Sequence, residues 1–380
     1  MRFSTITSVA NSVIKLKVRE MLGLPQSAPP YKLLIQMTND CNSRCKACLI
    51  WTINKEAPEK KERELQLDHY KQIFLQWGKN LRWLTLSGGE VTMVSYFKEV
   101  IDLACLHCPN LRLVAFTTNG LLPEVVLDYA RYIRAKQKDL FVTISLDGDE
   151  ELHDRIRGVR GNYQLVQEAF AKLRAEGFQV QFGMTIHESN SDFIMENYPG
   201  MAGKTKAINL SHSQGVFKAK VPLESRKIFG ALQTVTSHYQ KRSAGEWIEF
   251  AYLKLGLIFL GSDRTEVPLP CSVLGSSLHI MPDGEVHPCM YLPSLGNVKR
   301  TPLNEIIGGP KAQQARERIR KLDCAKCWMN CYAPHSIMQY PLKAIARMFR
   351  KPASGGCAGN KPGQLPERRS LTERGAPAHS

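Results

Sequence analysis

The chain has 380 residues, of which 43% are hydrophobic, and a formal net charge of +16 at pH 7. This length suffices for one large domain and a smaller one, and the apolar content excludes global disorder. The positive charge favours acidic partners such as phosphorylated small molecules, anionic lipid surfaces or nucleic acid. A basic, solvated surface without such a partner is an equally good interpretation.

Residues 1–30 form a basic, amphipathic N-terminal segment. Lys15 and Lys17 interrupt its apolar stretch, so a secretory signal is not expected. No apolar run in the chain approaches the roughly 18 residues that a membrane span needs. We therefore expect a cytoplasmic protein, with peripheral membrane contact through this segment as a weaker hypothesis and docking onto the rest of the chain as the alternative.

Short apolar strands alternate with amphipathic helices over residues 31–215. The strands are expected at 33–38, 82–87, 112–117, 141–146, 179–186 and 207–211. Helical patterns lie between them, for example over 67–77, from Pro123 and from Asn162. The alternation predicts an α/β fold with a parallel sheet, either open or curled into a partial (β/α)6 barrel.

Each of the first four strands is followed by an unusual polar loop. These loops read CNSRCKAC, SGGE, TTNG and SLDG in chain order. Because the carboxyl ends of parallel strands lie on the same rim of such a sheet, the four loops are expected to form one active site.

Three thiols fall within eight residues of the first loop, at Cys41, Cys45 and Cys48. This spacing lets one loop present three sulfurs to three irons of an iron–sulfur cluster, with the fourth iron open to another ligand. The spacing alone also permits a zinc site with a distant fourth ligand. In a cytoplasm, clustered thiols indicate metal rather than disulfides.

The pattern changes after residue 215. Residues 216–265 read as a helical linker, and residues 266–335 begin with a hairpin whose turn falls at 282–284. A basic helix and a disordered tail are expected over 336–380. Two cysteines in a helical pattern, Cys105 and Cys108, are expected to be buried thiols.

The four loops together resemble those of radical S-adenosylmethionine (radical SAM) enzymes. The resemblance implies that Cys41, Cys45 and Cys48 hold a [4Fe–4S] cluster whose open iron is chelated by the amine and carboxylate of SAM. One electron from a reductant such as flavodoxin or ferredoxin would then cleave SAM to a 5′-deoxyadenosyl radical. No catalytic residue is assigned beyond these ligands.

The same resemblance implies a set of SAM contacts. They are Ser87, Gly88, Gly89, Glu90, Asn119, Ser145 and Arg157. The two glycines would let backbone approach the methionyl group, and Glu90 would accept from its ammonium or anchor the loop. Arg157 would pair with the SAM carboxylate or with a nearby acid.

One position departs from the family pattern. The residue before the third cysteine, usually aromatic, is Ala47 here, so Ile50 or Trp51 is expected to pack near the adenine. The ends of the fifth and sixth strands, near Thr185 and Ser211, are also expected to approach it.

The C-terminal cysteines resemble those of the auxiliary-cluster domains called SPASM in the full form and twitch in the short form. The resemblance implies one auxiliary [4Fe–4S] cluster, with a structural zinc as the alternative. Its expected ligands are Cys271, Cys289, Cys324 and Cys327, with Cys331 as a substitute. Cys357 is expected to be free or to bind a second cluster.

The expected activity is hydrogen abstraction from a small molecule, such as a sugar, nucleotide or lipid precursor, with an oxidoreductase of the dehydrogenase type as the favoured class. The short auxiliary domain and the basic charge favour this substrate. The alternative is a maturase that modifies a peptide or protein. A non-enzymatic redox sensor is more distant, and nucleic acid is not expected because aromatic and basic residues do not interleave into a stacking platform.

Overall fold

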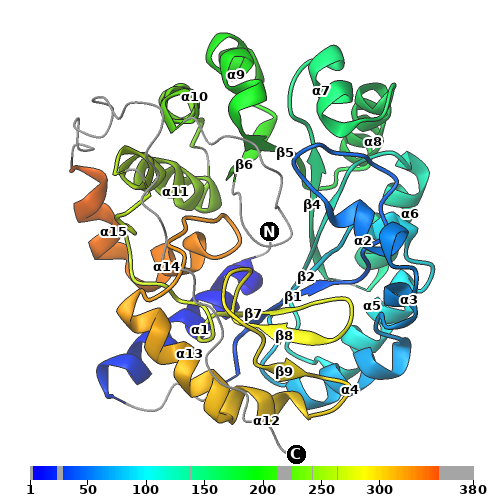
Figure 1. The fold of residues 1–380 in the computed structure, drawn as a ribbon, viewed down its shortest axis with the longest axis vertical. Helices are drawn as coiled ribbons and strands as arrows, with labels where there is room; N and C mark the ends of the chain where they lie inside the picture. Colours follow the sequence, from blue (N-terminus) through cyan, green and yellow to red (C-terminus); the bar gives the residue numbers. More distant parts are fainter. Residues whose placement is uncertain are drawn as a thin grey trace, which may run out of the picture.

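The computed structural model describes residues 3–23, 29–136, 138–211, 225–241, 243–262 and 264–350. Over these residues the strands form one nine-stranded sheet in the order β6-β5-β4-β3-β2-β1-β7-β8-β9. Helices lie around this curved sheet (Figure 1). In the part described, β6 and β9 lie at its two edges, so the α/β sheet predicted from the sequence is open rather than closed.

The first six strands are parallel neighbours and overlap the six predicted ones. Their bounds are β1 Lys32–Gln36, β2 Trp83–Ser87, β3 Leu113–Thr118, β4 Asp139–Ser145, β5 Val180–Ile186 and β6 Thr205–Leu210. All five residues of β1 are buried, as expected for a central strand covered on both faces.

Helices connect these strands, and the predicted helical patterns are confirmed. Their bounds are α2 Ile50–Glu56, α3 Glu59–Glu62, α4 Leu67–Trp77, the 3₁₀ turn η1 Val91–Met93, α5 Phe97–His107, α6 Pro123–Ala135, α7 Glu150–Arg157, α8 Asn162–Ala175 and α9 Glu188–Met201. In α4, the apolar stripe of Tyr70, Ile73, Phe74 and Trp77 is buried against the sheet, which is what its spacing predicts.

The C-terminal part adds two long helices, a hairpin and four further helices. Their bounds are α10 Ser225–His238, α11 Ala244–Gly261, β7 Ser277–Ile280, β8 Glu285–His287, β9 Gly296–Asn297, α12 Leu303–Gly308, α13 Pro310–Lys321, α14 Ala333–Gln339 and α15 Pro341–Met348. The predicted hairpin is present, with β7 and β8 antiparallel.

The hairpin does not form a sheet of its own. Strand β7 pairs in parallel with β1, in the register Lys32↔Ser277 to Ile35↔Ile280. Leu278 therefore shares one continuous core with the barrel strands. The segment expected as a separate auxiliary domain thus continues the sheet of the first.

The N-terminal segment forms α1 Phe3–Met21, which packs against the C-terminal helices. Val9 and Val13 are buried with Tyr31, and the Tyr340 hydroxyl donates to Glu20 at 2.9 Å. Docking onto the chain, the alternative foreseen for this segment, is therefore what the structure shows. None of the described helices is both long and apolar enough to cross a membrane.

The tail expected to be disordered lies largely outside the described residues, which end at 350. Cys357 lies outside them as well.

Candidate functional site

The cysteine loop, residues 38–49, leaves the carboxyl end of β1 and lies against the loop that follows β2. Gly89 N donates to Thr38 O at 2.7 Å. A Cβ at Gly88 would lie 2.7 Å from Thr38 O, and one at Gly89 would overlap Asp40 O. Both glycines are therefore required by contact between two backbones of this chain, and their contact with SAM stays a prediction.

Glu90 links the loop after β2 to the loop after β3 through hydrogen bonds. Its carboxylate is 1% exposed and accepts hydrogen bonds from Thr92 Oγ1 at 2.8 Å and Thr118 Oγ1 at 2.7 Å. Its other oxygen accepts from Asn119 N at 2.7 Å. These contacts match the loop-anchoring role foreseen for Glu90. Ser87, the last residue of β2, lies just before this loop.

Asn119 joins the end of β3 to the cysteine loop. Its Nδ2 donates to Asn42 Oδ1 at 2.7 Å and to Ser43 Oγ at 3.0 Å, and lies 3.9 Å from Cys41 Sγ. Its Oδ1 accepts from Leu121 N at 3.0 Å. The side chain thereby orients the first thiol, and a contact of Asn119 with SAM stays a prediction.

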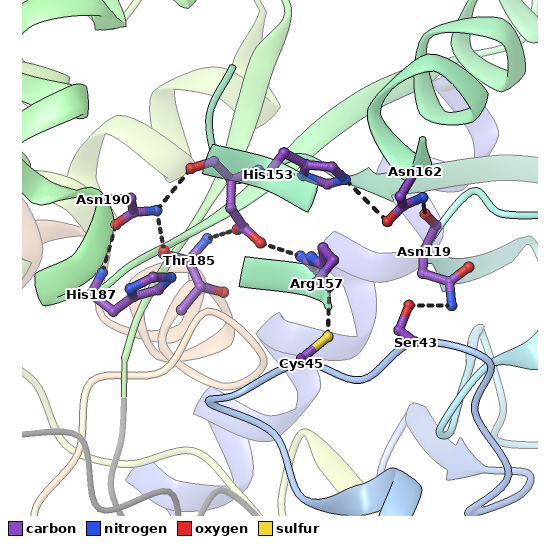
Figure 2. Close-up of polar contacts among 10 residues, drawn as sticks. Ser43, Cys45, Asn119, His153, Arg157, Asn162, Thr185, His187 and Asn190 are labelled. Atoms are coloured by element: carbon purple, nitrogen blue, oxygen red, sulfur yellow. Dashed lines mark hydrogen bonds and ion pairs between the residues drawn. The ribbon is translucent and has the colours of Figure 1, made fainter. Parts of the chain in front are cut away.

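Arg157, the last residue of α7, reaches the middle thiol. Its Nη1 lies 3.9 Å from Cys45 Sγ (Figure 2), and its Nη2 pairs with Asp147 Oδ2 at 2.6 Å. Its own carbonyl accepts from Arg44 N at 2.9 Å. The nearby acid foreseen from the sequence is therefore Asp147, and pairing of Arg157 with a SAM carboxylate stays a prediction. Ser145 is half-buried at the end of β4.

Trp51, rather than Ile50, faces open space beside the thiols. Ile50 is buried, whereas Trp51 lines a cavity of about 340 Å³ together with Cys41 and Met93. The Trp51 indole N–H donates to Cys45 O at 3.3 Å. Of the two residues expected near the adenine, only Trp51 is thus placed at a cavity.

At the other strand ends, Thr185 N donates to Asp147 Oδ1 at 3.2 Å, and Ser211 N donates to Ile186 O at 3.0 Å. Approach of Thr185 and Ser211 to an adenine stays a prediction.

The thiols of the cysteine loop fit an iron–sulfur cluster chemically. Burial raises the pKa of the Cys41 thiol to about 11 and also raises the pKa of the Cys48 thiol, so their thiolates need a cationic partner. Among the described residues, no three His, Cys, Asp or Glu side chains converge closely enough to hold a single metal ion. A cluster does not require that convergence, because each thiolate binds a different iron.

The structure brings the five C-terminal cysteines near one another. Burial raises the pKa of Cys327 well above its usual value, and the neighbouring thiols raise it further. Those neighbours are Cys271, Cys289, Cys324 and Cys331. They come from the two sides of the β7–β8 hairpin and from the segment between α13 and α14. Cys105 and Cys108 lie in and just after α5. Cys108 is fully buried as expected, whereas Cys105 is only partly buried, because it lies at the edge of the core cluster that Cys108 joins.

Sequence reasoning missed the residues that surround Arg157. Asp147 and His153 lie in the stretch SLDGDEELHDRIR that carries Ser145 and Arg157, so their positions were visible without their role. Asn162 and Asn190 gave no signal, because each has a partner in a loop after another strand, Asn119 for Asn162 and Asp147 for Asn190. Figure 2 shows His153, Asn162 and Asn190 together with Arg157 and Cys45.

Two family profiles match the chain. Residues 35–195 match the Radical SAM superfamily, and residues 271–332 match SPASM, an iron–sulfur cluster-binding domain. The chain therefore belongs to the radical SAM superfamily and carries a C-terminal SPASM domain. Membership implies a [4Fe–4S] cluster with SAM, and SPASM implies auxiliary iron–sulfur clusters. The cysteines present are consistent with both.

Several curated relatives resemble parts of the chain. The sporulation killing factor maturation protein SkfB of Bacillus subtilis is 28% identical over 46% of this chain and 40% of its own length. The antilisterial bacteriocin subtilosin biosynthesis protein AlbA of the same species is 22% identical over 74% of this chain and 60% of its own length. Pre-heme d1 synthase of Dinoroseobacter shibae is 24% identical over 80% of both chains.

The matches to SkfB and AlbA thus span only 40% and 60% of those proteins. Among solved structures, native anSMEcpe with bound AdoMet aligns with a TM-score of 0.56 at 14% identity, over 84% of this chain and 98% of that one. This likeness confirms the fold.

Proposed function

We propose that the chain is a radical SAM enzyme that modifies a peptide or protein substrate. The observation that carries the chemistry is the convergence of Cys41, Cys45 and Cys48 with Asn119 and Arg157 at the carboxyl ends of β1, β3 and β4. The choice of substrate is supported by SkfB and AlbA, which are named for maturation and for bacteriocin biosynthesis. This favours the alternative of the sequence analysis over its small-molecule expectation.

The chain's own residues bind and orient the reactive groups. Cys41, Cys45 and Cys48 would hold the cluster, and Arg157 would keep a positive charge at Cys45. When bound, the cluster and SAM supply the one-electron cleavage of SAM that starts hydrogen abstraction from the substrate. Glu90 holds two of the surrounding loops in register.

A second candidate is modification of a small anionic molecule, with an oxidoreductase outcome. It is supported by pre-heme d1 synthase, which this chain matches over 80% of both lengths, and by the net charge of +16. In either case a one-electron reductant such as flavodoxin or ferredoxin would serve the cluster, and the five C-terminal cysteines would hold auxiliary iron.

The test measures 5′-deoxyadenosine formation by anaerobic, iron-loaded protein with SAM and dithionite. Extract from source cells grown on deuterated amino acids is added in size fractions, each with and without protease digestion. We expect a protease-sensitive fraction to raise the rate and to transfer deuterium into 5′-deoxyadenosine. Cys45→Ala should abolish the product, whereas Cys105→Ala, outside both cysteine groups, should retain it.

Stimulation by a protease-resistant, low-mass fraction would instead support the small-molecule candidate. If cluster-loaded protein cleaves no SAM with any fraction, both candidates fail and a redox sensor becomes the better interpretation.

A further inference from the structure

We propose that Asp147 is a positioning residue for the cluster site: it holds Arg157 at Cys45 and, through His153 and Asn162, connects this contact to Asn119. The name Asp147 network is used below for five residues: Arg157, Asp147, His153, Asn162 and Asn119. This inference rests on the proposed function. It assigns roles to Asp147, His153 and Asn162, which have no role in the proposed function.

Asp147 is held by groups from helix α7, strand β5 and helix α9. Its side chain is 3% exposed and pairs with Arg157 at 2.6 Å, while its other oxygen accepts from Thr185 N at 3.2 Å. Its backbone carbonyl accepts from Asn190 Nδ2 at 3.1 Å, and the same amide donates to Thr185 O at 3.0 Å. The carboxylate that faces Arg157 therefore has little freedom to move.

His153 carries the connection from Asp147 to Asn162. Asp147 N can only donate, so at 3.2 Å it requires a lone pair on His153 Nδ1. The hydrogen is then on Nε2, which lies 3.1 Å from Asn162 Oδ1. Burial lowers the pKa of His153 to about 4, so this neutral tautomer persists at physiological pH. Figure 2 shows the imidazole directed at Asn162.

The network meets the cysteine loop at two neighbouring points. Asn162 Nδ2 donates to Asn119 O at 3.1 Å, and Asn119 in turn holds Ser43 at 3.0 Å. At the other end, Arg157 contacts Cys45. His153, Asn162 and Ser43 are all at most 1% exposed. Arg157 Nε is buried without a hydrogen-bond partner, but the other contacts of the network are made, and together they favour one geometry of the loop.

The network also sets the charge near the cluster. The reduction potential of an iron–sulfur cluster depends on net charge and on hydrogen bonds to its sulfurs. Arg157, at Cys45, would stabilise the reduced, more negative state of a bound cluster, and Asp147 would offset that cation. Neutralising Asp147 should therefore raise the potential, and neutralising Arg157 should lower it.

The experiment is a redox titration followed by electron paramagnetic resonance, on anaerobic full-length protein without SAM. A Cys271→Ala and Cys289→Ala background removes expected auxiliary ligands, so that the signal of the N-terminal cluster is isolated. Asp147→Asn should shift the midpoint potential upward and Arg157→Gln downward. The double variant should return towards the parent value, because both charges are gone.

A second arm tests positioning apart from charge. Asn162→Leu breaks the link from His153 to Asn119 and should speed loss of iron to a chelator several-fold, without moving the potential. Asn197→Leu is the matched control. Its exposed amide on α9 donates only to Phe193 O among the contacts resolved, so it should lose iron at the parent rate.

If Asp147→Asn and Arg157→Gln lower the iron content but leave the potential of the remaining cluster unchanged, their role is purely structural and the proposal is overturned. The proposal also fails if the two single variants shift in the same direction. If Asp147→Asn does not fold, the midpoint potentials of Arg157→Lys and Arg157→Gln test the proposal instead. Only the glutamine variant, which removes the positive charge, should lower the potential. Parent protein that binds zinc instead of a cluster would refute the proposed function itself.

Discussion

Lys32 Nζ lies 3.1 Å from His335 Nε2, so a side chain of the first strand of the sheet pairs with helix α14, 303 residues further along the chain. The same ammonium donates to Cys331 O at 3.3 Å and lies 4.3 Å from the centre of the Trp83 ring. His335 Nδ1 in turn lies 2.7 Å from the Tyr31 hydroxyl. Strand β1 and the segment that bears the C-terminal thiols are therefore held together by buried polar groups.

Removing one partner of this pair should be costly. Burial lowers the pKa of Lys32 to about 8, so at neutral pH the ammonium persists and depends on its partners. His335→Ala leaves it buried with one acceptor fewer, and we expect a loss of about 3 kcal/mol in the free energy of unfolding. Urea denaturation measures this loss.

The double variant Lys32→Met with His335→Phe provides the control. It replaces the polar pair with apolar groups of similar size and should cost less than the sum of the two single changes. Additive losses would show that the two side chains do not depend on each other.

Gly89 should not tolerate a side chain. Its Cβ would overlap Asp40 O, so Gly89→Ala must separate the cysteine loop from the loop after β2. We expect a loss of about 2 kcal/mol in stability and reduced iron content after reconstitution. Thermal unfolding and iron analysis measure the two effects.

Gly200→Ala is the matched control, because nothing lies within 4 Å of its added Cβ. It lies in α9, where alanine favours the helix, so stability should be unchanged or higher by less than about 1 kcal/mol. Equal losses in the two variants would contradict the proposed loop contact.

His279 should make the protein sensitive to acid. It is 2% exposed, and burial lowers its pKa from 6.5 to about 3. Between these values the unfolded chain binds a proton that the folded chain does not, so stability falls as the pH is lowered from about 6.5 to about 3. In His279→Phe, the free energy of unfolding should vary less with pH over this range.

Urea denaturation across that pH range tests the prediction. His238→Phe, on the exposed side of α10, should leave the slope as it is in the parent protein. An unchanged slope in His279→Phe would mean that the buried imidazole does not titrate as proposed.

Glu249 should make the protein less stable as the pH rises, which is the opposite of the effect of His279. It accepts from Asn330 Nδ2 at 2.8 Å and from Ile208 N at 3.4 Å, which joins α11 to β6 and to the segment of the C-terminal thiols. Burial raises its pKa from 4.5 to about 8. The folded chain then holds a proton that the unfolded chain releases, so stability falls as the pH rises from about 4.5 to about 8.

Glu249→Gln keeps the acceptor oxygen and removes the titration. Its unfolding free energy should vary less with pH over that interval, with the largest gain over the parent near pH 8. Glu305→Gln, exposed on α12, serves as the control. The same pH dependence in parent and Glu249→Gln would refute the assignment.

The sequence by itself determined the local elements and the chemistry-bearing loops. The apolar stripe of α4, the six parallel strands and the β7–β8 hairpin all follow from periodicity and turn residues, which act over a few positions. The placement of Cys41, Cys45 and Cys48 just after a strand was equally visible. Such features depend on neighbours in the chain, so they can be inferred without the fold.

Only the tertiary structure decided which distant segments meet. The pairing of β7 with β1, the contact of Gly89 with Asp40 and the ion pair between Asp147 and Arg157 join residues whose spacing along the chain carries no periodic signal. Whether these residues come into contact depends on the order of the strands in the sheet and on which loops then share its rim. Burial, and with it every shifted pKa, follows from that arrangement.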